Sequence, residues 1–131
     1  MRKFLNAALI VLTTGVLGGC LTSGSELGPL DAGAASLGGG LIGQMPGGGL
    51  PEDVRRSALD AEFQALEFAP AGQAVPWQAG SYHGEAIPTQ LYRVGSQDCR
   101  GYRQKVTRGS QTVEQIGTAC RTEAGAWKLV V

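Results

Sequence analysis

The sequence predicts an α+β fold: one amphipathic helix packed on a small antiparallel β-sheet of four or five strands, preceded by a flexible Gly-rich tether. Two observations lead to this prediction. Apolar residues recur with a helical period over residues 51–69, and over residues 75–131 they follow a period of two in short runs bounded by Gly and Pro. The loops between these runs are too short for crossover helices, so neighbouring strands should pair antiparallel.

The N-terminal residues have the order of a bacterial export signal. Two basic residues precede an apolar run ending at Leu17, which is shorter than the roughly 20 residues that a membrane-spanning helix needs. The run closes with the tetrapeptide LGGC, which resembles a lipobox, and no Ala-x-Ala-like cleavage site follows it. We therefore expect residues 1–19 to be a lipoprotein signal peptide, and Cys20 to be the lipid-attachment residue. The alternative is that Cys20 belongs to a signal peptide cut elsewhere.

Lipidation at Cys20 would make membrane attachment effectively permanent. Cysteines of this type usually carry several acyl chains, palmitate among them, and two or more chains anchor a protein stably. Leu21 follows the cysteine where Asp would favour retention at the inner membrane of enteric bacteria. The expected location is therefore the bacterial outer membrane, with the folded head either in the periplasm or at the cell surface.

Length and charge limit what the exported chain can be. After residue 19, 112 of the 131 residues are left, enough for one modest domain. The whole chain balances 11 basic and 11 acidic residues, and loss of Arg2 and Lys3 leaves a net charge of −2. We therefore expect no nucleic-acid partner.

Residues 20–50 are dominated by Gly, Ala, Ser and Leu. This composition cannot build a core, which predicts a flexible tether. Small residues nevertheless recur at every fourth position, which on a helix would form a short glycine zipper: Ala35, Gly39, Gly43 and Gly47. Pro46 interrupts that pattern, and a helix over residues 32–45 would rise only about 21 Å, too little to span a bilayer. A shallow or oligomeric membrane contact is the alternative to the tether.

Residues 51–69 form the predicted helix. Pro51 suits its first turn, and Pro70 ends it. Arg55 and Glu62 lie at the border of the apolar side, where we expect a boundary ion pair or exposed edge positions. The apolar side itself comprises Val54, Ala58, Leu59, Ala61, Phe63, Ala65, Leu66 and Ala69.

The pair Gly109-Ser110 predicts a two-residue type II′ hairpin turn. In the resulting register, the numbers of opposed residues add up to 219, and every opposed pair is favourable or permissible. The pairs are Thr107–Thr112, Val106–Val113, Lys105–Glu114, Tyr102–Gly117 and Cys99–Cys120. Directly opposed cysteines can meet disulfide distances in an oxidising envelope compartment, so we expect a Cys99–Cys120 disulfide. The third cysteine is then left for lipid.

Residues with catalytic chemistry are sparse. No Cys-x-x-Cys motif occurs, the chain has one histidine, His83, and no ligand cluster has a metal-site spacing. We therefore predict no enzymatic activity, metal or cofactor. A hydrolase, the alternative, would need His83 beside a nucleophile.

The lipobox, the Gly-rich segment and several longer motifs together resemble the rickettsial-type 17 kDa surface antigens, outer-membrane lipoproteins of alphaproteobacteria. The motifs are EDVRRSALDAEFQALEFAPAGQAVPW, LYRVGSQDCRGYRQKV, GTAC and GAWKLVV, and the resemblance covers most of the mature chain. The Gly-rich segment departs from the family pattern, because it is shorter and interrupted by proline.

The resemblance implies a lipidated Cys20, a bridged cysteine pair, and buried or platform roles for four aromatic residues. Together with Arg108 at the predicted turn, these aromatic residues form the candidate binding surface: Trp77, Tyr92, Tyr102, Arg108 and Trp127. The family has no established enzymatic activity.

The expected function is that of a lipid-anchored, surface antigen-like protein with a structural or interaction role in the envelope. Its partners would be the outer membrane, through the lipid, and another envelope protein or a second copy of the chain. The alternative is an envelope-tethered binding module that inhibits a soluble enzyme such as a lysozyme, with the turn at residues 108–111 as its docking loop.

Overall fold

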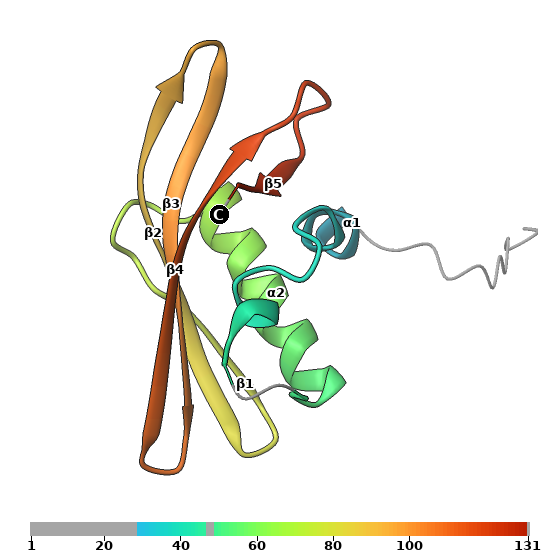
Figure 1. Ribbon diagram of the computed structural model, residues 1–131, viewed down its shortest axis with the longest axis vertical. Helices are drawn as coiled ribbons and strands as arrows, with labels where there is room; N and C mark the ends of the chain where they lie inside the picture. The colour runs from blue at the N-terminus through green and yellow to red at the C-terminus, as the bar shows by residue number, and fades with distance from the viewer. Residues whose placement is uncertain (1–28, 47–48, 131) are drawn as a thin grey trace, which may run out of the picture.

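The computed structural model of the chain describes residues 29–46 and 49–130. The helices are α1 (Pro29–Ser36), the short 3₁₀ helix η1 (Ile42–Gln44) and α2 (Glu52–Glu67), and the strands are β1 (Val75–Ala79), β2 (Tyr82–Val94), β3 (Gln97–Arg108), β4 (Gln111–Arg121) and β5 (Trp127–Leu129). Figure 1 shows α2 lying against a curled sheet, with α1 beside it. The predicted α+β fold is confirmed. The predicted signal peptide and Cys20 lie outside the described residues.

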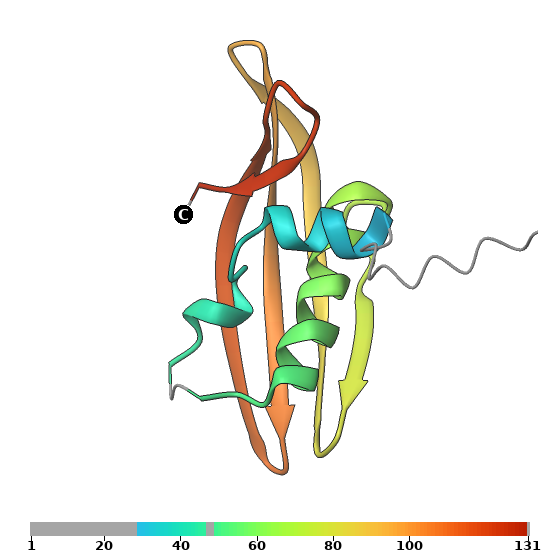
Figure 2. The ribbon, with the colours of Figure 1, turned by 90° about the vertical axis from the view of Figure 1, so that its right-hand side faces the viewer.

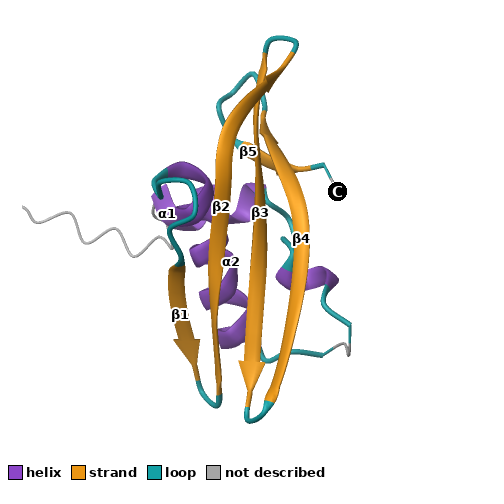
Figure 3. Ribbon diagram, turned by 90° about the vertical axis from the view of Figure 1, so that its left-hand side faces the viewer, coloured by secondary structure: helices purple, strands orange, loops and turns teal. Residues whose placement is uncertain are grey.

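The sheet is an antiparallel meander in the order β1-β2-β3-β4-β5. Helix α2 packs on one of its faces, and the segment from α1 to η1 lies on the same side (Figure 2). Seen from the opposite side, the strands lie in front of all the helices (Figure 3). Within the described residues, one face of the sheet therefore carries no helical cover. We call it the open face.

The predicted β3–β4 hairpin is confirmed residue by residue. All ten opposed pairs from Cys99–Cys120 to Arg108–Gln111 have numbers that add up to 219, and Gly109 has the positive φ of 60° that the turn needs. The same Gly-Ser dipeptide also makes the turns after β1 and β2, where Gly80 and Gly95 have φ of 55° and 63°. Three hairpins therefore use one turn chemistry.

Helix α2 begins one residue later and ends two residues earlier than predicted, at Glu52 and Glu67. Its C-terminal end is held by Arg100, a residue of β3. The guanidinium of Arg100 donates hydrogen bonds to the carbonyls of Ala65 and Leu66 at 3.0 Å each, and to that of Ala69. The side chain is 5% exposed. A buried cation at this end satisfies terminal carbonyls and complements the helix dipole.

Two apolar clusters fill the space between α2 and the sheet. One comprises Ile42, Val54, Ala58, Ala61, Ala65, Trp77, Ala86 and Val106, and the other comprises Leu37, Leu41, Leu66, Tyr102, Ala119 and Trp127. The second cluster draws two of its leucines from the Gly-rich segment. Residues 34–45 of this segment are therefore part of the folded domain.

The packing of the Gly-rich segment differs from both expectations for it. Helix α1 ends at Ser36, because Gly38 and Gly40 adopt φ of 63° and 59°, so within residues 29–46 no continuous helix carries the four-residue repeat. Gly47, its last member, lies outside the described residues. Ala35, Gly39 and Gly43 are exposed, whereas Leu37, Leu41 and Ile42 are buried. Between residues 34 and 45 the chain is thus neither a free tether nor a zipper helix, because its few large apolar residues complete the core.

Glu62 holds this segment in place from the centre of α2. Its two carboxylate oxygens accept hydrogen bonds from the backbone N–H groups of Leu41 and Ile42 at 2.9 Å, from the hydroxyl of Tyr102 at 2.8 Å and from the amide of Gln104 at 3.1 Å. Burial raises the pKa of Glu62, and the four donated bonds act in the opposite direction. The expected boundary ion pair or exposed edge position is wrong for this residue, which is 0% exposed.

Arg55, the other border residue of α2, is exposed as expected. It pairs with Glu52 one helical turn earlier. The contrast follows from the i, i+4 series of buried positions 58, 62 and 66, which places Glu62 in the middle of the packed side.

Candidate functional site

Three residues of the candidate binding surface are part of the core. Trp77 and Tyr102 are 8% and 1% exposed, and Trp127 is fully buried. Their polar atoms are bonded inside the protein: the indole N–H of Trp77 donates to Gln104 at 2.8 Å, and that of Trp127 donates to Glu67 at 2.7 Å. Of the two roles expected for these aromatic residues, buried or platform, the structure shows the buried one. Their assignment to a binding surface is wrong, because α2 and the Gly-rich segment cover them.

The other two residues, Tyr92 and Arg108, are exposed but lie at opposite ends of the long strands. Arg108 lies next to the β3–β4 turn, where it donates a hydrogen bond to the hydroxyl of Tyr82 at 3.2 Å and stacks 5.1 Å from that ring's centre. Tyr92 lies on β2, opposite Cys99. The five predicted residues therefore do not form one site.

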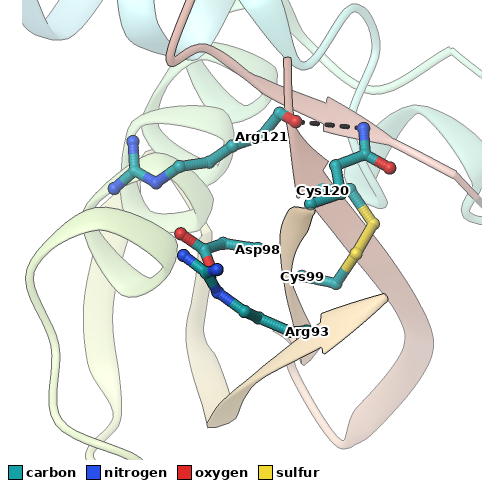
Figure 4. The surroundings of a disulfide bond; sticks show 6 residues. Arg93, Asp98, Cys99, Cys120 and Arg121 are labelled. Atoms are coloured by element: carbon teal, nitrogen blue, oxygen red, sulfur yellow. Dashed lines mark hydrogen bonds and ion pairs between the residues drawn. A yellow bond between two sulfur atoms is a disulfide. The ribbon is translucent and has the colours of Figure 1, made fainter. Parts of the chain in front are cut away.

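The predicted disulfide is confirmed. Cys99 on β3 and Cys120 on β4 are joined by an S–S bond of 2.03 Å, with both residues buried (Figure 4). Beside the bridge, the amide of Gln97 donates to the carbonyl of Arg121 at 3.0 Å. The bridge and this bond tie together β3 and β4 at the end of the sheet where β5 pairs.

A groove of about 630 Å³ lies on the open face of the sheet. Tyr102 and Gln104 point toward Glu62 on α2, so strand alternation places Gly101 and Arg103 on the other side. The residues that line the groove include Ile87, Thr89, Gly101, Arg103, Ile116 and Thr118. It is the candidate functional site.

Gly101 lies at the floor of the groove, where the absence of a side chain leaves space. A Cβ atom at this position would lie 2.9 Å from the hydroxyl of Thr89, which donates a hydrogen bond to the carbonyl of Gly101 at 3.0 Å. The register of β2 against β3 shifts between Pro88 and Leu91, next to this contact. Such irregularities bend a strand locally and re-aim its side chains. The hollow therefore depends on a missing side chain and an adjacent bulge.

The walls of the groove combine apolar side chains with one cation. Ile87, Arg103 and Ile116 are directly opposed on three neighbouring strands, so Arg103 lies between two isoleucines on one face of the sheet. Ile116 is 70% exposed, and Arg103 is exposed with no ion-pair or hydrogen-bond partner for its side chain among the described residues. In contrast, Lys105 in the next row is paired with Glu85 at 3.6 Å.

This arrangement can bind a group that is apolar and carries an acid. Exposed apolar side chains gain from being covered, and a free guanidinium matches a carboxylate or phosphate. The groove brings both features within one cross-strand row, at Ile87, Arg103 and Ile116.

Catalytic groups are not assembled at the groove. His83 is exposed on β2, opposite Thr107, whose hydroxyl is bonded to that of Thr112 at 2.9 Å, and the described part of the chain supplies no side-chain partner for His83. Over residues 29–46 and 49–130, no three potential metal ligands lie together. The absence of enzymatic activity stays a prediction.

Sequence reasoning missed the groove and the buried Glu62. The pairing of Arg103 with Ile116 follows from the predicted hairpin register, so this half of the row could have been found. Ile87 could not, because the turn at Gly95 by itself gives a β2–β3 register in which opposed numbers add up to 191. The shift between Pro88 and Leu91 changes this sum to 190 and brings Ile87 opposite Arg103. For Glu62 the indication of burial in the sequence was weaker: it lies four residues after Ala58 and four residues before Leu66, both on the apolar side of the helix.

Comparison of the chain with protein-family models, with curated proteins and with solved structures finds no match. No helix among the described residues is long and apolar enough to span a bilayer.

Proposed function

We propose that this protein is a lipid-anchored outer-membrane protein, similar to surface antigens, with a structural or interaction role in the bacterial envelope. The proposed anchor is Cys20, supported by the order of basic residues, apolar run and lipobox in the first 20 residues. The disulfide of the folded domain is compatible with an oxidising compartment outside the cytoplasm.

The observation that carries the interaction role is the groove on the open face. It combines the half-buried Ile87 and the exposed Ile116 with the guanidinium of Arg103, which has no partner among the described residues. The described helices leave this part of the sheet uncovered. Anchoring would confine this surface to a thin layer beside the membrane, where a weak contact with a neighbouring envelope component becomes effective. The proposed partner presents an apolar group next to an acid.

Replacing Cys20 by serine tests the anchor. We expect the variant to leave the membrane fraction and to lose incorporation of a labelled fatty acid, because serine offers no thiol for acylation. Cell fractionation and metabolic labelling measure both effects.

The double replacement of Cys99 and Cys120 by alanine is the matched control. It removes the other two cysteines and should leave acylation and membrane attachment unchanged. Continued membrane attachment of an unlabelled Cys20 variant would contradict the anchor assignment.

Photo-crosslinking in intact cells tests the groove. A benzoylphenylalanine at position 116, inside the groove, should give an adduct of defined mass, and adding Arg103→Glu should remove that adduct because the charge is reversed. The same probe at Arg56, exposed on α2 on the other side of the domain, is the control.

Mass spectrometry of the adduct then identifies the partner. An adduct with twice the mass of the chain would identify a second copy, and another mass would identify a different envelope protein. Equal adducts at positions 116 and 56, insensitive to Arg103→Glu, would contradict a binding role for the groove.

A further inference from the structure

We propose that the tip of the β2–β3 hairpin inserts into the interface of the membrane to which the chain is anchored. This inference rests on the proposed lipid anchor and adds a second, non-covalent contact with the bilayer. The tip comprises residues 91–97, and Figure 1 shows this hairpin extending past the end of α2.

The tip exposes three large apolar side chains. Leu91, Tyr92 and Val94 are 60%, 44% and 58% exposed. They are near neighbours at the end of one hairpin, so they form one apolar tip and not scattered surface positions. Exposed groups of this kind mark a place that something else covers.

The apolar residues occupy both faces of the hairpin. Leu91 is opposed to Arg100, whose guanidinium reaches the carbonyls of α2, so Leu91 faces the helix side. Tyr92 is opposed to Cys99 and, by strand alternation, faces the open side together with Val94. A protein partner docked on one face of the hairpin would leave the apolar side chains of the other face exposed to water. A bilayer interface surrounds an inserted tip and covers both.

The three hairpin turns of the protein provide an internal comparison. Each consists of Gly-Ser, at Gly80, Gly95 and Gly109, and each glycine has a positive φ. The turn at Gly109 is flanked by Thr107 and Arg108 on β3 and by polar residues on β4. The turn at Gly80 follows Ala79, which is half-buried, whereas the turn at Gly95 follows Val94, which is 58% exposed. Exposed large apolar residues are therefore not a requirement of the turn itself.

The charges at the tip are compatible with insertion. Arg93 and Asp98 are directly opposed and form an ion pair with a distance of 3.0 Å between Nε and Oδ1, so this pair adds no net charge to the tip. Tyr92 has an apolar ring with a polar hydroxyl, a combination that favours the membrane–water interface. Arginine stems can lie along apolar surroundings with the charged group directed toward water.

The length of the chain before the domain brings the membrane within reach. Eight residues, 21–28, separate the proposed lipidated Cys20 from the start of α1, and they span at most about 28 Å when fully extended. Phe68, 68% exposed, follows the end of α2, and that end is bonded to Arg100 opposite Leu91. Apolar exposure thus gathers at one end of a domain that cannot move far from the bilayer.

Fluorescence from the turns tests the insertion. The lipidated full chain is reconstituted into vesicles of phosphatidylethanolamine and phosphatidylglycerol, with the environment-sensitive dye NBD on a cysteine that replaces Ser96 in the tip. The matched control carries the dye at Ser110, in the Gly-Ser turn with polar flanks. We expect a blue-shifted emission and quenching by doxyl-labelled phospholipid at position 96 and neither effect at position 110.

Substitutions then assign the effect to the apolar side chains. The double variant Leu91→Ser/Val94→Ser should lose both the blue shift and the lipid quenching at position 96. Ile116→Ser removes an apolar residue that is 70% exposed on the open face, away from the tip, and should leave both signals unchanged.

Several results would overturn the inference. Equal emission and quenching at positions 96 and 110 would place both ends in the same environment. A blue shift without lipid quenching that disappears at one chain per vesicle would identify a second copy as the cover. Vesicle flotation of the same samples separates this inference from the anchor: chains that float with a water-exposed tip contradict only the insertion, whereas chains that do not float contradict the anchor.

Discussion

Replacing Glu62 by alanine should lower the free energy of unfolding by about 4 kcal/mol. The carboxylate accepts four hydrogen bonds in the core, from Leu41, Ile42, Tyr102 and Gln104. Alanine would leave these donors without their acceptor and create a cavity between α2 and the Gly-rich segment. Urea unfolding, followed by the fluorescence of the two buried tryptophans, measures the loss.

Two further variants separate the buried acid from a general effect on α2. Glu62→Gln keeps the shape but turns an amide N–H₂ toward groups that donate hydrogen bonds, so its loss should be smaller, about 2 kcal/mol. Glu52→Ala on the exposed first turn removes only the ion pair with Arg55 and should cost less than 1 kcal/mol. Similar losses for Glu52→Ala and Glu62→Ala would contradict the role assigned to Glu62.

Hydrogen exchange can localise the effect of Glu62→Ala. The amides of Leu41 and Ile42 donate to its carboxylate, so their protection should fall most. Amides in the centre of the β3–β4 ladder should lose only the protection expected from the lower global stability. Unchanged protection at Leu41 and Ile42 would show that the segment is held by packing alone.

Removing the disulfide should lower the free energy of unfolding by about 3 kcal/mol. Cys99 and Cys120 are separated by 21 positions, and their bridge restricts the unfolded chain by closing this loop. The double variant Cys99→Ala/Cys120→Ala is preferred, because a single replacement leaves a reactive thiol. Thermal unfolding of the double variant, and of the reduced wild-type protein, measures the effect.

The fold should survive this loss, because the turn at Gly109 and the β3–β4 ladder do not require the bridge. The control is the double variant itself, whose stability should not change on addition of reductant. Equal stability of the oxidised and reduced wild-type protein would contradict the presence of the bridge.

Features that depend on residues close together along the chain were predictable from the sequence. The turn at Gly109 determined the β3–β4 register, and the register placed Cys99 opposite Cys120. The helix over residues 51–69 followed from its apolar period and was found at Glu52–Glu67. In each case the interacting residues lie within one helix or one hairpin, so local periodicity and turn chemistry are sufficient.

The candidate site was less predictable because a strand pattern does not say which face of a sheet will be covered. For Trp77, Tyr102 and Trp127 the expectation left buried and platform roles open, and the structure places all three in the core. Alternation separates the two faces of a strand, but only the docking of α2 decides which face becomes the interior. The groove at Gly101 then lies on the face that is left.

The sequence by itself determined the helix, the hairpin register, the disulfide and the motif that predicts lipidation at Cys20. Only the tertiary structure decided that residues 34–45 of the Gly-rich segment join the core, that Glu62 is buried and that the open face carries a groove. These features depend on contacts between distant parts of the chain, such as the hydrogen bond from the hydroxyl of Ser36 to the carbonyl of Trp127, 91 residues apart. A glycine-rich stretch has too few large side chains to indicate its partner, so its place in the fold is set by the cavity that α2 and the sheet leave for it.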